Sequence, residues 1–448
     1  MQQTRFTIFV RESNAMLVQR FFWVGLMLCT GTVGWSQDFA TIYFGDPDIE
    51  KQIDDYRKDK GVVGLGLAVV HDGEIVYLRG YGKEDREADI FVDPKATRFR
   101  WASVSKTLTG VLAVMADNDG IVDLDTNVPY YYPSYKVPNK YYVGGNLNNG
   151  QSVPWFRRFI TMRQLLSHTS GIQHYSNGLK RPEPPASLAA DKNVNTGMEW
   201  ALSYWVDNPL IDLPGNRWSY STPAYNLAGV VLEQKMGGSF DQLTQMLIAQ
   251  PAGMTTLRPD TLWNPAPRRA VGYTLSGGVA TRDNRDDDVS WKLAGGGFIS
   301  TVEDMGRYAA ALLGDEILSP AEKLDMWSPQ SLRNGDLTNW SLGWRIRQGT
   351  ASDLDFKVEH GGAQTKARCH LSLYPNRGLA VAVMTNSSTN CDTRGLARDI
   401  EEIVIDRLDA GDAPIKKGYD HLDMIAEPLF PSIGLFRSVT TTYRTLSR

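Results

Sequence analysis

The sequence has few cysteines, no surplus of basic residues and a low mean hydropathy. Only 3 cysteines occur among 448 residues, which excludes a small disulfide-stapled scaffold. The net charge is −4, so the chain lacks the basic surplus of nucleic-acid-binding proteins, and we expect no nucleic acid among its partners. A mean hydropathy of −0.31 excludes a polytopic membrane protein. What remains is an ordinary globular composition, with 42% hydrophobic and 22% charged residues, which excludes collagens, long coiled coils and largely disordered chains.

The N-terminal segment has the pattern of an export signal. Arg20 precedes a short apolar run over residues 21–29, and small residues follow, with Gly34 and Ser36 near its end. This pattern predicts a signal peptide over residues 1–36, cut after Ser36, and an exported protein of the periplasm or the extracellular space. An uncleaved membrane tether or a lipid anchor at Cys29 fits less well, because the run is short for a span and Leu28 is bulky for a lipidation site. We therefore expect no stable membrane span after signal cleavage.

Cleavage would leave two cysteines, Cys369 and Cys391. Two cysteines cannot form a zinc site by themselves, and no histidine lies at metal-binding spacing from them. In an oxidising compartment they could form a disulfide, but two separate buried thiols are an equally open interpretation. We expect no metal and no organic cofactor.

Strand patterns occur near both ends of the chain, with helical patterns between them. Residues 62–70 and 74–78 flank a turn at 71–73, and residues 367–374 and 379–385 flank a turn at 375–378, so each pair predicts a hairpin. Asp392 is placed to cap a helix running to about residue 408. This order predicts an α+β fold: an antiparallel sheet built from both termini, flanked by helices, with an inserted and mainly helical lobe. We assign residues 37–410 to one domain and 411–448 to a tail or small appendage.

Two segments have the composition of inserted loops. Residues 130–156 are rich in Tyr, Gly and Asn, and residues 176–195 contain a run of prolines. The tyrosines could line a substrate cleft, although packing of the loop against the body is the interpretation we favour.

The strongest chemical signal is Ser103-Val-Ser-Lys106 at the start of an apolar helical pattern. Lys106 would lie one turn from Ser103 on the same helix face. A serine hydroxyl needs an adjacent base to become a nucleophile, and a lysine can act as that base if burial or neighbouring charge lowers its pKa. The helix N-terminus would add N–H groups directed at a developing oxyanion. Alone, this spacing occurs by chance in many exposed helices, and Ser105 is then an ordinary structural serine.

Two further motifs have chemical potential. Tyr220-Ser-Thr222 precedes a second apolar helix, and a tyrosine there could move a proton between nucleophile and leaving group. By itself this pattern is more typical of a capped helix with a buried tyrosine. His360-Gly361-Gly362-Ala363 precedes the predicted strand at 367, and its glycines would let a backbone edge approach a ligand closely. A β-bulge or tight turn would need the same residues.

Together, in this order, the three motifs resemble the serine β-lactamase and penicillin-binding protein family, in its class C-like branch of esterases and D-peptidases. The strings at residues 165–171, which include His168, and at 294–304 agree with the resemblance, which covers about residues 48–408. It implies that Ser103 is the acylated nucleophile, Lys106 its base and Tyr220 a proton relay. It implies that His360 replaces the lysine of the family's Lys-Thr-Gly element and that the N–H groups of Ser103 and Ala363 form the oxyanion hole.

One position departs from the family pattern. Thr222 stands where many lactamases carry an Asn that holds a substrate amide, and a hydroxyl offers less to that amide. With His360, this departure argues against efficient β-lactam turnover. The resemblance implies an exported serine hydrolase acting on an ester, a D-amino-acid peptide or a β-lactam, with Thr222 and the segment 361–363 binding a small-molecule or peptide substrate. A non-turnover protein that binds penicillin or cell-wall peptide is the alternative. We interpret His168 as a structural residue of its loop.

Overall fold

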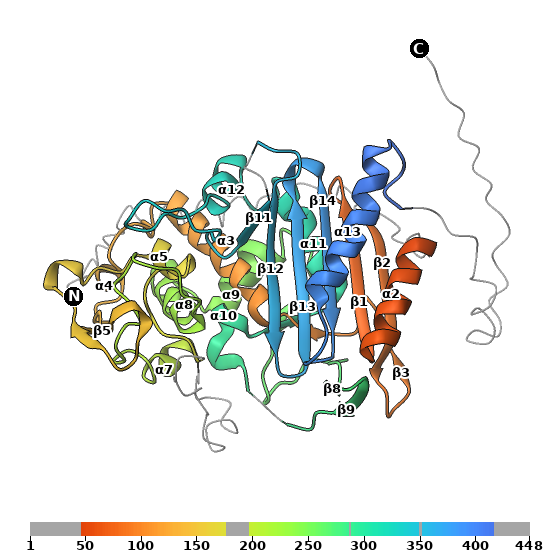
Figure 1. The fold of residues 1–448 in the computed structure, drawn as a ribbon, viewed down its shortest axis with the longest axis horizontal. Coiled ribbons are helices and arrows are strands. Elements are labelled where there is room, and N and C mark those ends of the chain that lie inside the picture. The colour runs from red at the N-terminus through yellow and green to blue at the C-terminus, as the bar shows by residue number, and fades with distance from the viewer. Residues whose placement is uncertain (1–45, 176–196, 286–287, 349–351, 416–448) are drawn as a thin grey trace, which may run out of the picture.

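The computed structural model describes residues 46–175, 197–285, 288–348 and 352–415. A seven-stranded antiparallel sheet dominates one half of the molecule, and helices form most of the other half (Figure 1). None of the helices in these ranges is long and apolar enough to cross a membrane. The predicted signal peptide, the segment 176–195 and most of the segment 411–448 lie outside the described residues.

The sheet joins the two ends of the domain, as predicted. Its strand order is β11-β12-β13-β14-β1-β2-β3. The strands β1 (Gly64–His71) and β2 (Glu74–Asp85) form the first hairpin, and β13 (Ala367–Tyr374) and β14 (Leu379–Thr385) form the second. Antiparallel pairing of β14 with β1, from Leu65↔Thr385 to His71↔Leu379, connects the two hairpins. The remaining strands of this sheet are β3 (Ile90–Phe91), β11 (Arg345–Gln348) and β12 (Lys357–Gln364).

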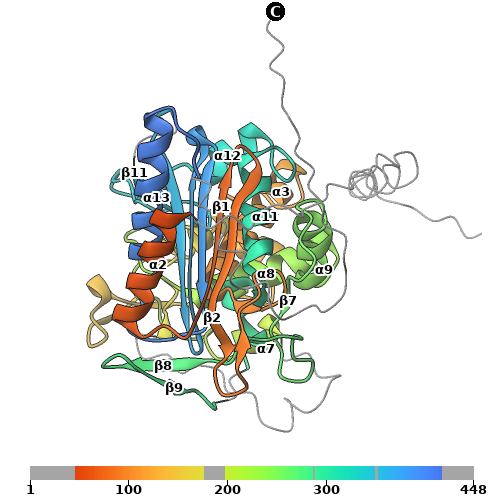
Figure 2. The ribbon, with the colours of Figure 1, turned by 90° about the vertical axis from the view of Figure 1, so that its right-hand side faces the viewer.

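Helices cover both faces of the sheet (Figure 2). On one face, α2 (Pro47–Lys60) and α13 (Thr393–Asp409) bury a cluster of aliphatic side chains that includes Ile53 and Ile400. The predicted capping by Asp392 is present, because its side chain accepts a hydrogen bond from Gly395 N. The other face is covered by α11 (Val302–Leu313) and continues into the helical lobe.

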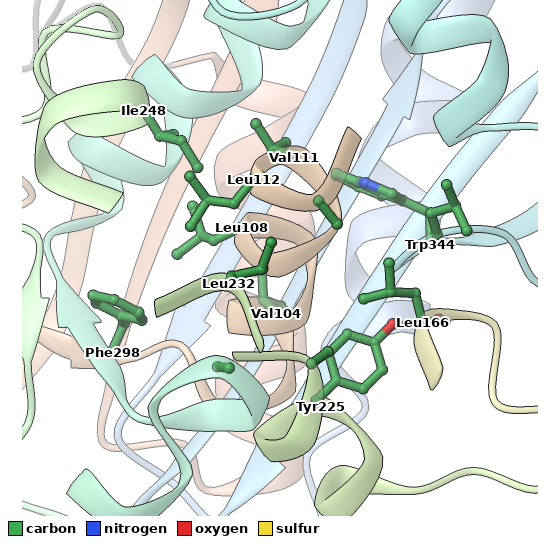
Figure 3. Close-up of a cluster of buried hydrophobic side chains, with 14 of the residues drawn as sticks. Val104, Leu108, Val111, Leu112, Leu166, Tyr225, Leu232, Ile248, Phe298 and Trp344 are labelled. Carbon is green, nitrogen blue, oxygen red and sulfur yellow. Dashed lines mark hydrogen bonds between the residues drawn. The ribbon is translucent and has the colours of Figure 1, made fainter. Parts of the chain in front are cut away.

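The helix α3 (Ser105–Asn118) runs through the centre of the lobe. Nearly all of its side chains are buried, so it is apolar around its whole circumference, as a central helix should be. Figure 3 shows Leu108 and Leu112 of α3 among side chains from distant segments, including Leu232 of α8 (Thr222–Met236), Phe298 and Trp344. This packing fixes the start of α3 against the sheet, where the candidate site lies.

Shorter elements complete the described fold. The short helices are α4 (Val128–Tyr131), α5 (Met162–Leu166), α7 (Met198–Leu202), α9 (Phe240–Thr244), α10 (Leu293–Gly296) and α12 (Pro320–Met326). The short strands are β4 (Phe99–Arg100), β5 (Lys140–Tyr142), β6 (Gly150–Ser152), β7 (Arg258–Pro259), β8 (Tyr273–Ser276), β9 (Val279–Arg282) and β10 (Phe298–Ser300).

The segment 130–156 is more ordered than a pure loop, since it contains the β5–β6 hairpin. Tyr131, Tyr132 and Tyr135 are buried in the core of the lobe, and none of the six tyrosines of this segment lines the cavity described below. Packing against the body is therefore the correct interpretation for these three tyrosines.

Candidate active site

Ser103 lies at the junction between the sheet side and the helical lobe. It is the middle residue of a 3₁₀ turn, Ala102–Val104, that leads directly into α3. Trp101 anchors the turn, since its N–H donates to Phe298 O at 2.9 Å and its indole N–H to Ser300 Oγ at 2.6 Å. Ala102 has a φ of +46°, a left-handed conformation that costs a non-glycine residue about 1–2 kcal/mol. The surrounding contacts thus hold a strained backbone immediately before the serine.

Lys106 lies beneath Ser103 and is fully buried. Its Nζ is 3.3 Å from Ser103 Oγ, 3.1 Å from Thr222 Oγ1 and 2.5 Å from Gly295 O. Burial, together with the positive charge of Lys292, holds the pKa of Lys106 well below its usual value. A neutral amine can donate to Gly295 O and Thr222 Oγ1 and still present its lone pair to the Ser103 hydroxyl. The arrangement is therefore suited to removing the serine proton.

Tyr220 stands beside this pair, just before α8. Lys106 Nζ is 5.0 Å from the centre of its ring. Burial raises the pKa of Tyr220 well above its usual value, while hydrogen bonds to Ser103 and Thr222 act in the opposite direction. The phenol is thus protonated at neutral pH and contacts both hydroxyls, which suits it to passing a proton rather than to acting as a standing base.

His168 supports Tyr220 and does not line the cavity. Its ring lies 4.2 Å from the Tyr220 ring, centre to centre, and its Nδ1 accepts a hydrogen bond from Ser221 N at 3.1 Å. Its carbonyl accepts from Ser219 N at 2.7 Å. Contacts on both sides of residue 220 therefore fix the tyrosine, which agrees with a structural role for His168.

The strand β12 forms another side of the site. His360 is buried, and its Nδ1 is 2.8 Å from Gly361 O, so this nitrogen carries the proton and Nε2 is left as an acceptor. Burial and the nearby Lys106 lower the pKa of His360 to about 3. His360 is therefore neutral at physiological pH, unlike the lysine whose place it takes in the resemblance.

Gly362 allows β12 to approach the turn Ala102–Val104, which carries Ser103, closely. A Cβ at this position would lie 2.2 Å from Cys369 Sγ and 2.5 Å from Trp101 O, so no larger residue fits without movement. In the described part of the chain, β11 pairs with residues 357–359 of β12 and leaves the edge at 361–364 free of a strand neighbour. That edge, with Ala363 exposed, faces the same cavity as Ser103.

The structure brings the predicted residues together around one cavity of about 540 Å³. Seven of them line it: Ser103, Tyr220, Thr222, His360, Gly361, Gly362 and Ala363. Lys106 lies behind them, bonded to Ser103 and Thr222. Thr222 is itself nearly buried, and its hydroxyl is engaged by Lys106.

Several residues of the site were not predicted individually. Gly295 accepts a hydrogen bond from Lys106 through its carbonyl, and a Cβ there would lie 2.5 Å from Thr222 Cγ2. The glycine run at 295–297 was the available signal. Lys292 donates to Gln364 Oε1 at 2.8 Å, and both residues line the cavity. Trp340 contributes an indole ring whose centre lies 5.4 Å from the centre of the His360 imidazole.

One end of the cavity is rich in arginines. Arg345, Arg347, Arg368 and Arg394 line it, against two carboxylates, Glu359 and Asp392. Glu359 is already paired with Arg347, and Asp392 accepts the capping hydrogen bond of α13. Burial lowers the pKa of Arg345, as does the crowding of positive charge from Arg347 and Arg394, while Glu359 acts in the opposite direction. An anionic group on a ligand would relieve this crowding.

Cys369 and Cys391 also line the cavity, and both are free thiols. Cys369 donates to Trp101 O at 2.8 Å, and Cys391 donates to Ser387 O at 3.3 Å. The sequence left a disulfide and two separate thiols open, and the structure has two separate thiols.

Comparison with known proteins identifies the family. A family model described as Beta-lactamase matches residues 49–404. The chain belongs to the beta-lactamase family. It is 24% identical to the human protein "Serine beta-lactamase-like protein LACTB, mitochondrial", over 78% of each chain. Members of the family are serine hydrolases.

Solved structures show the same fold. "EstCE1, a hydrolase with promiscuous acyltransferase activity" superposes with a TM-score of 0.61 at 20% identity, covering 79% of this chain and 98% of that one. The D-amino acid amidase from Ochrobactrum anthropi SV3 superposes with a TM-score of 0.60 at 20% identity, covering 82% of this chain and all of the amidase. The α+β fold is thus that of the β-lactamases and transpeptidases, as the motifs implied.

Proposed function

We propose that this chain is an exported serine hydrolase that forms an acyl-enzyme on Ser103 and cleaves small esters or D-amino-acid amides. The observation that carries the proposal is the pair formed by Ser103 and a fully buried Lys106 at 3.3 Å, with burial and Lys292 favouring the neutral amine. A serine becomes a nucleophile when such a base accepts its proton. Export rests on the pattern of residues 20–36, and the substrates of EstCE1 and the amidase are properties of those proteins.

Acylation would begin with transfer of the Ser103 hydroxyl proton to Lys106 Nζ. Ser103 Oγ attacks the substrate carbonyl carbon, and the carbonyl oxygen becomes an oxyanion held by the N–H groups of Ser103 and Ala363. The bond to the leaving group then breaks. The proton passes from Lys106 through Tyr220 to the leaving alcohol or amine, which restores the neutral lysine and leaves Ser103 as an ester.

Deacylation would reverse these proton transfers with water as the nucleophile. The water gives a proton to the Tyr220–Lys106 pair as its oxygen attacks the acyl carbon. Ser103 Oγ leaves and takes that proton back, and the acid product is released. His360 stays neutral throughout, so its Nε2 acts as a hydrogen-bond acceptor in the cavity rather than as a cation.

The arginines at the end of the cavity favour substrates that carry a negative group away from the scissile bond. Arg345 is the most informative of them, because its Nε is buried and has no hydrogen-bond partner among the described residues. A carboxylate at this position would gain a charge-assisted hydrogen bond. Thr222 offers no free amide or carbonyl to hold the side-chain amide of a penicillin, which supports esters and D-amides over β-lactams.

The test is a matched panel of chromogenic esters, D-amino-acid anilides, penicillins and cephalosporins, with each ester made with and without a terminal carboxylate. We expect turnover of esters or anilides to exceed that of every β-lactam, and Ser103→Ala to abolish it. Stoichiometric acylation without turnover of any member would instead identify a penicillin- or peptide-binding protein. A kcat/KM for a β-lactam above all others would contradict the proposed substrate class.

A further inference from the structure

Large apolar side chains are exposed in unusual number at the end of the helical lobe. Five are exposed between residues 130 and 159: Tyr130 (73%), Leu147 (47%), Trp155 (82%), Phe156 (63%) and Phe159 (41%). We call these five the tip patch. Soluble proteins rarely gather exposed aromatic side chains in this way, and such patches mark interaction surfaces.

The local fold holds the tip patch together. The N–H of Val153 donates to Asn139 O at 2.8 Å, which places Trp155 and Phe156 beside the β5–β6 hairpin. The N–H of Ile160 donates to Asn127 Oδ1 at 3.1 Å, which places Phe159 beside α4. Figure 1 shows α4 and β5 at the end of the lobe that is farthest from α2 and α13.

The same segment is strongly basic. Residues 126–175 contain no Asp or Glu, but include Lys136, Lys140, Arg157, Arg158 and Arg163, in a chain with a net charge of −4. Arg163 is paired with Asp125 and Asp325. The side chains of Lys136, Arg157 and Arg158 donate instead to uncharged oxygens, namely Pro133 O, Asn216 Oδ1 and Val153 O. Lys136, Lys140 and Arg158 are exposed. None of the hydrogen bonds named for Lys136, Arg157 and Arg158 is to a carboxylate, so these bonds leave the positive charge of the three side chains uncompensated.

We propose that the tip patch docks on the anionic surface of a lipid bilayer. Trp, Tyr and Phe side chains partition into the interface between headgroups and acyl chains, and Lys and Arg beside them attract anionic lipids. Both kinds of residue are present on one exposed end. A second copy of the chain fits less well, because a two-fold contact would place the same basic segment opposite itself.

Backbone hydrogen bonds connect the base of this segment to the chain that leads to one wall of the cavity. Lys140 O accepts a hydrogen bond from Leu210 N at 2.9 Å, and the adjacent Ile211 N donates to Gly171 O at 2.7 Å. Gly171 is three residues before His174, which lines the cavity. The inference concerns binding alone and does not depend on the proposed hydrolase activity.

The test is sedimentation of the full chain with vesicles that contain phosphatidylglycerol, compared with vesicles of phosphatidylcholine alone. We expect binding to the anionic vesicles that weakens as salt is raised, because salt screens exposed charges. The double variant Trp155→Ser/Phe156→Ser should weaken binding by more than about tenfold. Lys140→Glu/Arg158→Glu should weaken it by at least about fivefold for each charge removed.

A matched control removes exposed apolar side chains elsewhere. Val279 and Leu354 are 66% and 55% exposed. Val279→Ser/Leu354→Ser should bind vesicles like the unmodified chain, and all variants should keep their melting temperature. Equal binding by the tip variants would show that another part of the chain, such as the apolar N-terminal segment, holds the lipid, and would overturn the proposal. A lipid-independent dimer that the tip variants abolish would also overturn it.

Discussion

Lys106 Nζ lies 3.3 Å from Ser103 Oγ, and its other two hydrogen-bond partners are uncharged oxygens of Thr222 and Gly295. A lysine paired with a carboxylate would keep its proton, because an opposite charge raises the pKa of an amine. Here burial and the positive charge of Lys292 act in the opposite direction. The geometry and the electrostatics of this pair therefore both support the proposed role of Lys106 as the base.

The first prediction is the pH dependence that follows from this base. Lys106 must be deprotonated to act, and its pKa is held well below the free value of about 10.4, so kcat/KM for an ester should already be high at neutral pH. It should fall as the pH is lowered through the depressed pKa. Lys106→Arg should abolish turnover, because a guanidinium cannot release its proton. A kcat/KM that rises only near pH 10 would show that the lysine is charged in the enzyme.

The second prediction is that Lys106 and Tyr220 act as one unit. Both contact the Ser103–Thr222 pair, so loss of either should break the same proton path. Residues that act together give non-additive losses. Lys106→Ala with Tyr220→Phe should therefore lower kcat/KM little more than the worse single change. Fully additive losses would assign one of the two a purely structural role.

The third prediction contrasts two adjacent glycines. Gly362→Ala should lower both stability and activity, because its Cβ would lie 2.2 Å from Cys369 Sγ and 2.5 Å from Trp101 O. Overpacking of this kind costs about 1–3 kcal/mol. Gly361→Ala is the control, since its Cβ would approach no atom closer than 3.5 Å. Thermal melts and ester kinetics check both variants, and equal effects at the two positions would contradict the close approach of β12 to the turn that carries Ser103.

The sequence predicted the parts of the fold that are encoded locally. Both hairpins and the capped helix α13 depend on alternation, turn residues and a capping side chain, all of which lie within a short stretch of sequence. The segment 130–156 was predicted as loop, because its Tyr, Gly and Asn residues do not show that residues 140–142 and 150–152 pair as strands. In the candidate site, the side chains that carry the proposed chemistry could be named from the motifs at residues 103–106, 220–222 and 360–363.

Other features of the site depend on distant backbone contacts. Gly295 O accepts a hydrogen bond from Lys106, and no sequence pattern could predict this, because every residue type carries a carbonyl.

The interpretation of Tyr131, Tyr132 and Tyr135 as packing residues is confirmed, since all three are buried. The sequence could not decide between a disulfide and two separate thiols at Cys369 and Cys391, because pairing depends on the separation and direction of the two side chains. The structure has two free thiols.

The fourth prediction concerns Thr222. Its hydroxyl holds Lys106, so Thr222→Asn keeps an oxygen for the lysine and adds an amide N–H₂ that can face a substrate. A missing hydrogen bond at a buried polar contact costs about 1–3 kcal/mol, or roughly 5- to 150-fold in rate. The change should therefore raise kcat/KM for β-lactams more than for esters. An equal or larger gain for esters would show that Thr222 does not limit β-lactam turnover.

The central claim is that Ser103 alone is acylated, and mass spectrometry of the trapped protein tests it most directly. After reaction with a fluorophosphonate, the account predicts one adduct per chain, on the peptide that contains Ser103 and at that residue. Ser103→Ala should take up none while melting at the same temperature as the unmodified chain. An adduct on Ser105 or Ser221, or undiminished labelling of Ser103→Ala, would contradict the account.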